Sequence, residues 1–103
     1  MGDWTFLSDH AHVLIALARE PRSDATRMAR VTGIDADDVS AILRDLEVDG
    51  YIRRERQGST QFTFIDREKP LRHVIERHHT VGELLNAVES SGRTLRARLS
   101  AKD

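Results

Sequence analysis

The sequence contains no cysteine, only two prolines and few aromatic residues. Without cysteine the chain can form no disulfide and no thiol nucleophile, and a cysteine-ligated metal site is excluded. Aromatic residues make up 5% of the 103 residues, so the core must consist mainly of Leu, Ile, Val and Ala. No apolar run approaches the roughly 20 residues of a membrane-spanning helix, and the first residues lack the basic-then-apolar pattern of a signal peptide. We therefore expect one cytoplasmic domain.

Motifs of the common enzyme classes are also missing. The chain has no glycine-rich phosphate-binding loop. No nucleophile stands in a recognisable strained turn of the kind that presents a catalytic serine. We therefore predict that the protein is not an enzyme and needs no cofactor.

The charge balance is nearly neutral, with 16 basic and 17 acidic residues and a formal net charge of −1. This balance argues mildly against nucleic-acid binding, for which an excess of basic residues is expected. The basic residues are nevertheless clustered, and all of them except Lys69 and Lys102 are arginine. The arginine clusters, rather than the total, indicate where an anion could bind.

Residues 26–51 have the pattern of a helix, a tight turn and a second helix. Gly33 permits the left-handed backbone that a sharp turn requires. Asp35 can cap the second helix by accepting hydrogen bonds from free backbone N–H groups, and Gly50 follows its last turn, where a C-terminal cap is expected. The second helix has an apolar stripe formed by Val39, Ile42, Leu43 and Leu46. The preferred cap of the first helix of this pair is Thr26, with Ser23 as the alternative.

The segment before this pair predicts another helix, which is apolar nearly all round and should therefore be the most buried. Ser8 or Asp9 can cap it. Trp4 and Phe6 precede it and are expected to act as apolar anchors, packed on the later helices.

After Gly50 the hydrophobic period changes from that of a helix to that of strands. Residues 51–57 predict one strand with a basic arm, residues 58–60 the turn, and residues 61–65 a second strand rich in β-branched and aromatic residues. The expected structure is a β-hairpin.

The remainder of the chain is predicted to be mainly helical. Residues 71–79, after Pro70, fit either a short helix or an extended arm, and Leu71, Val74 and Ile75 are expected to pack in both cases. Thr80 can cap the next helix together with Glu83 at the capping-box position. Leu95 and Leu99 continue its stripe, although Ser90, Ser91 and Gly92 can interrupt the helix.

The most specific motifs are DLEVDGYI before the basic hairpin and PLRH and TVGELL after it. With these motifs the chain resembles small winged helix-turn-helix regulators of actinobacteria, of MarR/ArsR-like architecture, over roughly residues 4–88. The resemblance implies a mainly α fold with a β-hairpin wing. It also implies a winged helix-turn-helix domain over residues 1–79 and a C-terminal dimerisation helix over residues 80–103 of the same domain.

The resemblance further implies double-stranded DNA as the partner and a homodimer that reads a palindromic operator. A recognition helix at about residues 36–49 would enter the major groove, and a basic wing at about residues 53–61 would contact the backbone or minor groove. Arginine suits phosphate because its bonds are directional and charge-assisted. The candidate DNA-binding residues are Arg27, Arg30, Asp37, Ser40, Arg44, Arg53, Arg54, Arg56, Gln57, Ser59 and Thr60.

Two features weigh against a simple transfer of the DNA-contacting residues. Between Asp35 and Asp49 the chain has one arginine against five aspartates and one glutamate, about −5 in charge. The aspartates can instead stabilise the start of the helix through its dipole. The basic hairpin can likewise be a solvated edge that charge protects from aggregation. The alternative function is therefore a winged-helix protein-interaction module without DNA binding, which uses its acidic helix.

The C-terminal helix has an apolar stripe with little of the domain left to cover it. This stripe either packs on the protein's own first helix or forms a two-fold dimer interface, and we favour the dimer. The expected interface residues are Val81, Leu84, Leu85, Val88 and Leu95. A crevice at such an interface could bind a small effector that the sequence does not identify.

Five histidines suggest a metal sensor, because ArsR-type relatives can bind metal between helices. They are His10, His12, His73, His78 and His79. No pair of them has the i, i+4 spacing that places two ligands on one helix face. We therefore expect no metal site.

Overall fold

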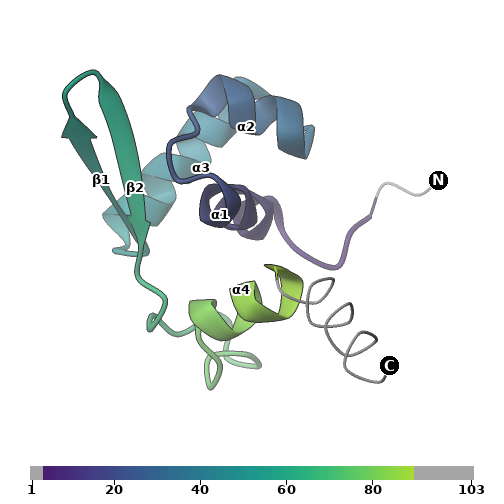
Figure 1. Ribbon diagram of the computed structural model, residues 1–103. Coiled ribbons are helices and arrows are strands. Elements are labelled where there is room, and N and C mark those ends of the chain that lie inside the picture. Colours follow the sequence, from purple (N-terminus) through teal and green to yellow (C-terminus); the bar gives the residue numbers. More distant parts are fainter. Residues whose placement is uncertain (1–3, 90–103) are drawn as a thin grey trace, which may run out of the picture. The chain divides into compact units, whose positions relative to one another are not determined.

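The computed structural model describes residues 4–89, and within them it contains four helices and a two-stranded antiparallel sheet (Figure 1). The mainly α fold with a β-hairpin wing is therefore confirmed. The chain divides into two compact units, Met1–Ile65 and Asp66–Asp103. The elements are α1 (Asp9–Arg19), α2 (Ala25–Thr32), α3 (Ala36–Val48), β1 (Ile52–Gln57), β2 (Thr60–Ile65) and α4 (Val81–Glu89).

Helix α1 supplies the centre of the first unit. Five consecutive residues of α1, from Val13 to Leu17, are buried, as expected of a helix that is apolar nearly all round. Ser8 caps the helix by accepting a hydrogen bond from the Ala11 N–H at 3.2 Å. The rest of this core comes from Met28, Val39, Ile42, Leu43, Leu46 and Ile52.

The cap of α2 differs from the prediction. Asp24, and neither Thr26 nor Ser23, accepts the hydrogen bond from the Arg27 N–H, at 2.8 Å. An N-cap must directly precede the first helical residue in extended backbone. Asp24 meets this condition with φ −97° and ψ 177°, whereas Thr26 already lies in the first turn of α2.

The turn between α2 and α3 forms as predicted. Gly33 has φ 78° and donates its N–H to the Ala29 carbonyl at 2.9 Å. Asp35 caps α3 by accepting a hydrogen bond from the Asp37 N–H at 3.2 Å. The left-handed glycine ends one helix and the aspartate starts the next within three residues.

The predicted C-terminal glycine cap of α3 is also present. Gly50 has φ 82° and donates to the Glu47 carbonyl at 3.1 Å, while the Tyr51 N–H donates to the Leu46 carbonyl at 2.8 Å. These two bonds form the Schellman arrangement, which satisfies the last carbonyls of a helix and turns the chain sharply. The turn leads directly from α3 into β1.

The hairpin pairs Ile52 with Ile65 at its base and Gln57 with Thr60 at its tip. The turn is therefore one residue shorter than predicted and consists of Gly58 and Ser59. A glycine with positive φ at the first turn position, here φ 65°, is typical of two-residue hairpins. On its other side β2 is anchored by a hydrogen bond from the Thr63 N–H to the Pro21 carbonyl at 3.0 Å.

The expectation that Trp4 and Phe6 are packed anchors is wrong. Trp4 is 71% exposed and Phe6 is 92% exposed, and their rings contact each other edge to face with centroids 5.0 Å apart. Apolar character makes burial favourable but does not guarantee that a covering surface exists in the same chain.

Residues 71–79 form neither the short helix nor the extended arm. A bridge between Pro70 and Thr80 closes the segment, and the Leu71 N–H donates to the His79 carbonyl at 2.9 Å. The segment is therefore a turn-rich loop with tied ends. Val74 and Ile75 are 62% and 76% exposed, so the expectation that they pack is wrong.

Helix α4 begins with the predicted capping box. The Thr80 N–H donates to Glu83 Oε1 at 2.8 Å, and the Glu83 N–H donates to Thr80 Oγ1 at 3.2 Å. Gly82 donates its N–H to the Arg67 carbonyl at 2.8 Å, and a Cβ at this position would lie 2.9 Å from that oxygen. A glycine is therefore required where the linker crosses the first turn of α4. Leu95 and Leu99 lie outside the described residues.

The corrected cap of α2 can be tested by substitution. Asp24→Ala should lower the free energy of unfolding by about 0.5–2 kcal/mol, because the Arg27 N–H loses its acceptor. Thr26→Ala should change it by less than about 0.5 kcal/mol. Urea denaturation followed by circular dichroism measures both, and a larger loss for Thr26→Ala would contradict the cap.

The capping box of α4 predicts a pH dependence. The Thr80 N–H, and then the His79 side chain, lower the pKa of the Glu83 carboxyl below its ordinary value. A lowered pKa means that the charged form stabilises the folded state above the unfolded pKa of about 4.3, and that this contribution is lost as the pH falls further.

Thermal unfolding of wild type and Glu83→Gln at a series of pH values checks this dependence. Wild type should be more stable than Glu83→Gln near pH 7. This difference in the free energy of unfolding should shrink as the pH falls below about 4.3 towards the lowered folded-state pKa of Glu83. Glu76→Gln, which changes an exposed glutamate in the loop before α4, is the matched control. A difference that stays constant with pH would contradict the assignment.

Candidate nucleic-acid interface

Helix α3 presents an outer face opposite its buried stripe. The buried residues Val39, Ile42, Leu43 and Leu46 fix the side of α3 that packs on the first unit. With 3.6 residues per turn, Asp37, Ala41, Arg44 and Val48 then lie on the opposite side, with Ser40 beside them. All five are exposed. These five residues include one cation, Arg44, and one carboxylate, Asp37, and the exposed Asp45 flanks them on the side opposite Ser40.

At least three of the six acidic residues between Asp35 and Asp49 have intramolecular roles. Asp35 is the cap of α3. Asp45 Oδ2 lies 3.0 Å from His10 Nε2 of α1, and Glu47 Oε1 accepts from Arg54 Nη2 at 2.7 Å. The acidic composition of α3 is thus partly explained by contacts that join α3 to α1 and to β1.

Glu47 and Arg54 connect the end of α3 to the wing. Arg54 donates to Glu47 Oε1 through both Nε, at 3.2 Å, and Nη2. The Arg54 side chain is 29% exposed, whereas Arg53 is 67% exposed and Arg56 is also exposed, so Arg54 is the most covered of the three arginines on β1. A guanidinium held in this way is only partly available to a phosphate.

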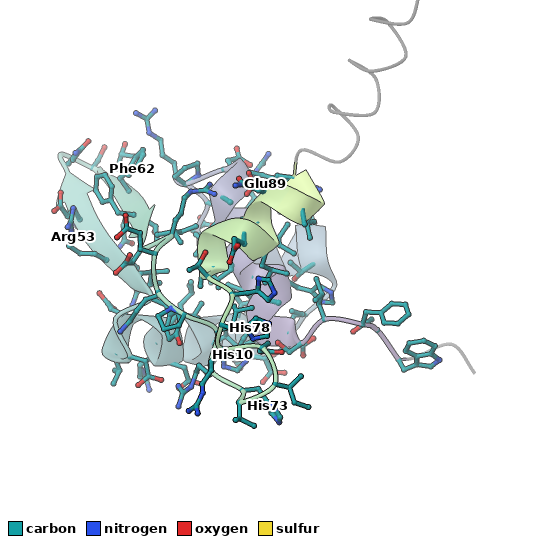
Figure 2. The ribbon with its side chains drawn as sticks, turned by 90° about the horizontal axis from the view of Figure 1, so that it is seen from below. His10, Arg53, Phe62, His73, His78 and Glu89 are labelled. Atoms are coloured by element: carbon teal, nitrogen blue, oxygen red, sulfur yellow. The ribbon has the colours of Figure 1, made fainter. Side chains whose placement is uncertain are left out.

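The outward face of the hairpin carries a different arrangement. Arg53 lies over the Phe64 ring with its guanidinium carbon 4.7 Å from the centroid, and its Nε is 3.0 Å from Glu55 Oε2. The Phe64 ring in turn packs against Phe62 at 4.8 Å. Figure 2 shows Arg53 and Phe62 on this hairpin. Cation–π contact and ion pairing therefore hold Arg53 against the sheet.

The remaining candidates differ in whether they have an intramolecular partner. Arg27 is paired, with its Nε 2.7 Å from Glu20 Oε1. Within residues 4–89, Arg30, Arg44 and Arg56 form no ion pair, and all three are exposed. The tip residues Gln57, Ser59 and Thr60 are exposed as well.

Sequence reasoning identified these arginines but missed Glu47 and Glu20 as their partners. A signal for Glu47 is present in retrospect. Glu47 and Arg54 flank a glycine-capped turn and have opposite charge, and the Schellman turn folds the strand back beside the end of the helix. No comparable local signal indicates Glu20, which is seven residues before Arg27 across a helix boundary.

The histidines do not assemble into a metal centre in the part of the chain that the structure describes, where no group of three or more possible ligands is close enough to hold an ion. His10 pairs with Asp45, and His79 Nδ1 lies 3.3 Å from Glu83 Oε1. His78 and His79 contact each other with ring centroids 4.2 Å apart.

The sequence of residues 5–60 matches the model of the MarR family. The chain belongs to the MarR family. The match covers α1, the helix-turn-helix pair, β1 and the turn of the hairpin, and membership implies a DNA-binding transcription regulator and not an enzyme. No curated protein matches the chain closely. Within the described residues, every helix is too short or too polar to traverse a bilayer.

The different environments of Arg54 and Arg56 predict different effects on stability. Arg54→Ala should lower the free energy of unfolding by about 0.2–1 kcal/mol, the usual range for a partly exposed ion pair. Arg56→Ala removes the same charge from the same strand and should change it by less than about 0.5 kcal/mol. Chemical denaturation at low salt measures both.

A cycle that combines Arg54→Ala with Glu47→Ala separates the pair from other effects of each change. The coupling between the two positions should be favourable and should weaken at high salt. If the two substitutions changed the free energy of unfolding by strictly additive amounts at low salt, the Glu47–Arg54 bridge would be contradicted.

Proposed function

We propose that this MarR-family protein binds DNA as a homodimer, with the outer face of α3 in the major groove and the β1–β2 wing on the phosphate backbone of a palindromic operator. The observation that carries the proposal is the Glu47–Arg54 bridge, which joins α3 to the wing inside one compact unit. The two DNA-contacting elements then approach the duplex as one body.

The proposal assigns different roles to the cations according to their partners. Arg44 on α3 and Arg56 on β1 are exposed and unpaired among residues 4–89, so they bind without breaking an intramolecular contact. Arg27, Arg53 and Arg54 must exchange a carboxylate for a phosphate, which reduces their net contribution. Arg30 adds a flanking phosphate contact.

Base readout would use the outer face of α3. Arg44 can donate two hydrogen bonds to a guanine, and Asp37 can accept one from the amino group of a cytosine. Ser40 can bond to either a donor or an acceptor. Gln57, Ser59 and Thr60 at the tip of the hairpin would contact phosphate or sugar oxygens, which position the protein without reading sequence.

The homodimer is proposed to use the less buried side of α4. Val81 and Leu85 are 1% and 0% exposed in the single chain, so they have little area left for a partner. Leu84 and Val88 are half-buried and would supply the contact. Leu95, the fifth expected interface residue, lies outside the described residues.

The role of Arg56 can be tested by its effect on salt dependence. Arg56→Ala should weaken binding to all duplexes and reduce the slope of log K against log[salt] by about 1, because one fewer counterion is released. Arg77→Ala, which removes an equal charge from the loop before α4, should leave the slope unchanged. Fluorescence anisotropy with the DNA upstream of the protein's own gene, at several salt concentrations, measures both.

The same titration tests the alternative of an interaction module that uses its acidic helix. Binding of the wild type to DNA at low salt, with a salt slope that Arg56→Ala reduces by about 1, supports the DNA-binding proposal. Absence of binding at every salt concentration, together with recovery of a basic protein by pull-down that Asp37→Asn and Asp38→Asn abolish, would replace it with the alternative.

A further inference from the structure

The outward face of the hairpin carries two aromatic rings between two arginines. Thr63 is buried on the inward face, so its neighbours Phe62 and Phe64 face outward, and Arg53, which pairs with Phe64 in the register, shares their face (Figure 2). The two ring centroids lie 4.8 Å apart. The guanidinium carbon of Arg53 lies 4.7 Å from the Phe64 centroid, and that of Arg22 lies 5.8 Å from the Phe62 centroid. Cation, ring, ring and cation thus form one continuous column.

Backbone hydrogen bonds fix this column. The Thr63 N–H donates to the Pro21 carbonyl at 3.0 Å, so the connector between α1 and α2 runs beside β2. Arg22 follows Pro21 directly, which places it at the Phe62 end. The Arg53–Phe64 pairing of β1 with β2 sets the other end. All four side chains of the column therefore belong to one compact unit.

Phe64 is the accessible ring of the column. It is 37% exposed, and Phe62 packs beside it. Arg53 lies over Phe64, but it is 67% exposed and its partner Glu55 is 46% exposed, so both of its contacts are weak in water. A flat ligand can replace the guanidinium on the ring at little cost. The displaced Arg53 is then available to an anionic group beside that ligand.

We infer that this outward face of the hairpin binds single-stranded DNA, with an unpaired base stacked on Phe64 and the adjacent phosphates bound by Arg53 and Arg22. An aromatic platform flanked by arginines is the arrangement that binds single strands without reading their sequence. A base inside a duplex already stacks on its neighbours above and below. Only an unpaired base can therefore use the Phe64 ring.

The charge of the face selects a polyanion over an apolar partner. Its charged residues are Arg22, Arg53 and Glu55, so the cations outnumber the carboxylate. An apolar protein surface would cover both arginines without a counter-charge, which is unfavourable. A nucleic-acid strand offers a base to the ring and a phosphate to each arginine at the same time.

The choice of DNA over RNA rests on the proposed function. There the outer face of α3 and the tip of the hairpin lie on a duplex, and the outward face belongs to the same unit. The strand nearest to this face is then an unpaired stretch of the same DNA beside that duplex. The stacking site itself does not depend on how the duplex is bound.

Oligothymidine of about 12 nucleotides, within the ~4–16 nucleotides that one small domain covers, is the first probe. In fluorescence anisotropy at low salt, the full-length wild type should bind it, and Phe64→Leu should weaken binding at least fivefold because one base stack is lost. Phe64→Tyr keeps a ring and should retain the affinity. Phe6→Leu, the same change at an exposed phenylalanine outside the hairpin, should leave it unaltered. None of these changes should alter the affinity for the duplex by more than about twofold.

A tryptophan at the platform gives a second readout that reports stacking directly. Trp4 is the only tryptophan of the chain, so Trp4→Phe combined with Phe64→Trp leaves one indole, at the platform. Oligothymidine should quench its fluorescence through stacking, whereas the duplex should not. A variant that binds oligothymidine without quenching would overturn the inference.

Three further results would overturn it. They are absence of oligothymidine binding at low salt, equal losses on oligothymidine and duplex in Phe64→Leu, and tighter binding of oligouridine than of oligothymidine, which would assign the face to RNA. The proposed function fails separately. Phe64-dependent binding of oligothymidine with no duplex binding at any salt would contradict the proposed function and leave this site standing.

Discussion

The ion pair between Glu47 and Arg54 is the interaction on which the arrangement of the proposed DNA-contacting surface depends. The chain passes from the last turn of α3 to the start of β1 within a few residues, and Gly50 sets the direction of that passage. A hairpin of two strands is marginally stable by itself, so its orientation must come from contacts with the helices. The Thr63–Pro21 hydrogen bond holds one side of the hairpin, and the Glu47–Arg54 pair holds the other.

This way of fixing the wing has an electrostatic consequence. The carboxylates that pair with candidate arginines would lie near an approaching phosphate and repel it. Each paired arginine must also give up its carboxylate before it can bind phosphate. Glu20 with Arg27, Glu47 with Arg54 and Glu55 with Arg53 all follow this scheme. Arg30, Arg44 and Arg56 remain without an ion pair among residues 4–89, so one copy of the proposed interface has few cations there that bind phosphate without competition.

The sequence predicted the fold well where the determining contacts are local. Gly33, Asp35, Gly50 and the Thr80–Glu83 capping box each act within four residues, and their roles were confirmed. The Asp24 cap was missed because the N-cap is the residue directly before the first helical residue. The sequence pattern did not predict that α2 begins at Ala25. Trp4, Phe6, Val74 and Ile75 were placed wrongly because hydrophobicity indicates which residues favour burial and not what covers them. The partners of the arginines depend on distances through space, which spacing along the chain predicts only across a tight turn.

Among residues 4–89, few arginines of the proposed interface lack an ion pair, and this makes the dimer important to the proposed function. Phosphate contacts supply much of the affinity for DNA, and each lost contact weakens binding at physiological salt. When two copies are joined, the second wing and helix bind at a high effective concentration once the first has bound, so two weak half-sites act as one stronger site. The gain depends on how rigidly the copies are joined, because a flexible joint would let the half-site spacing vary.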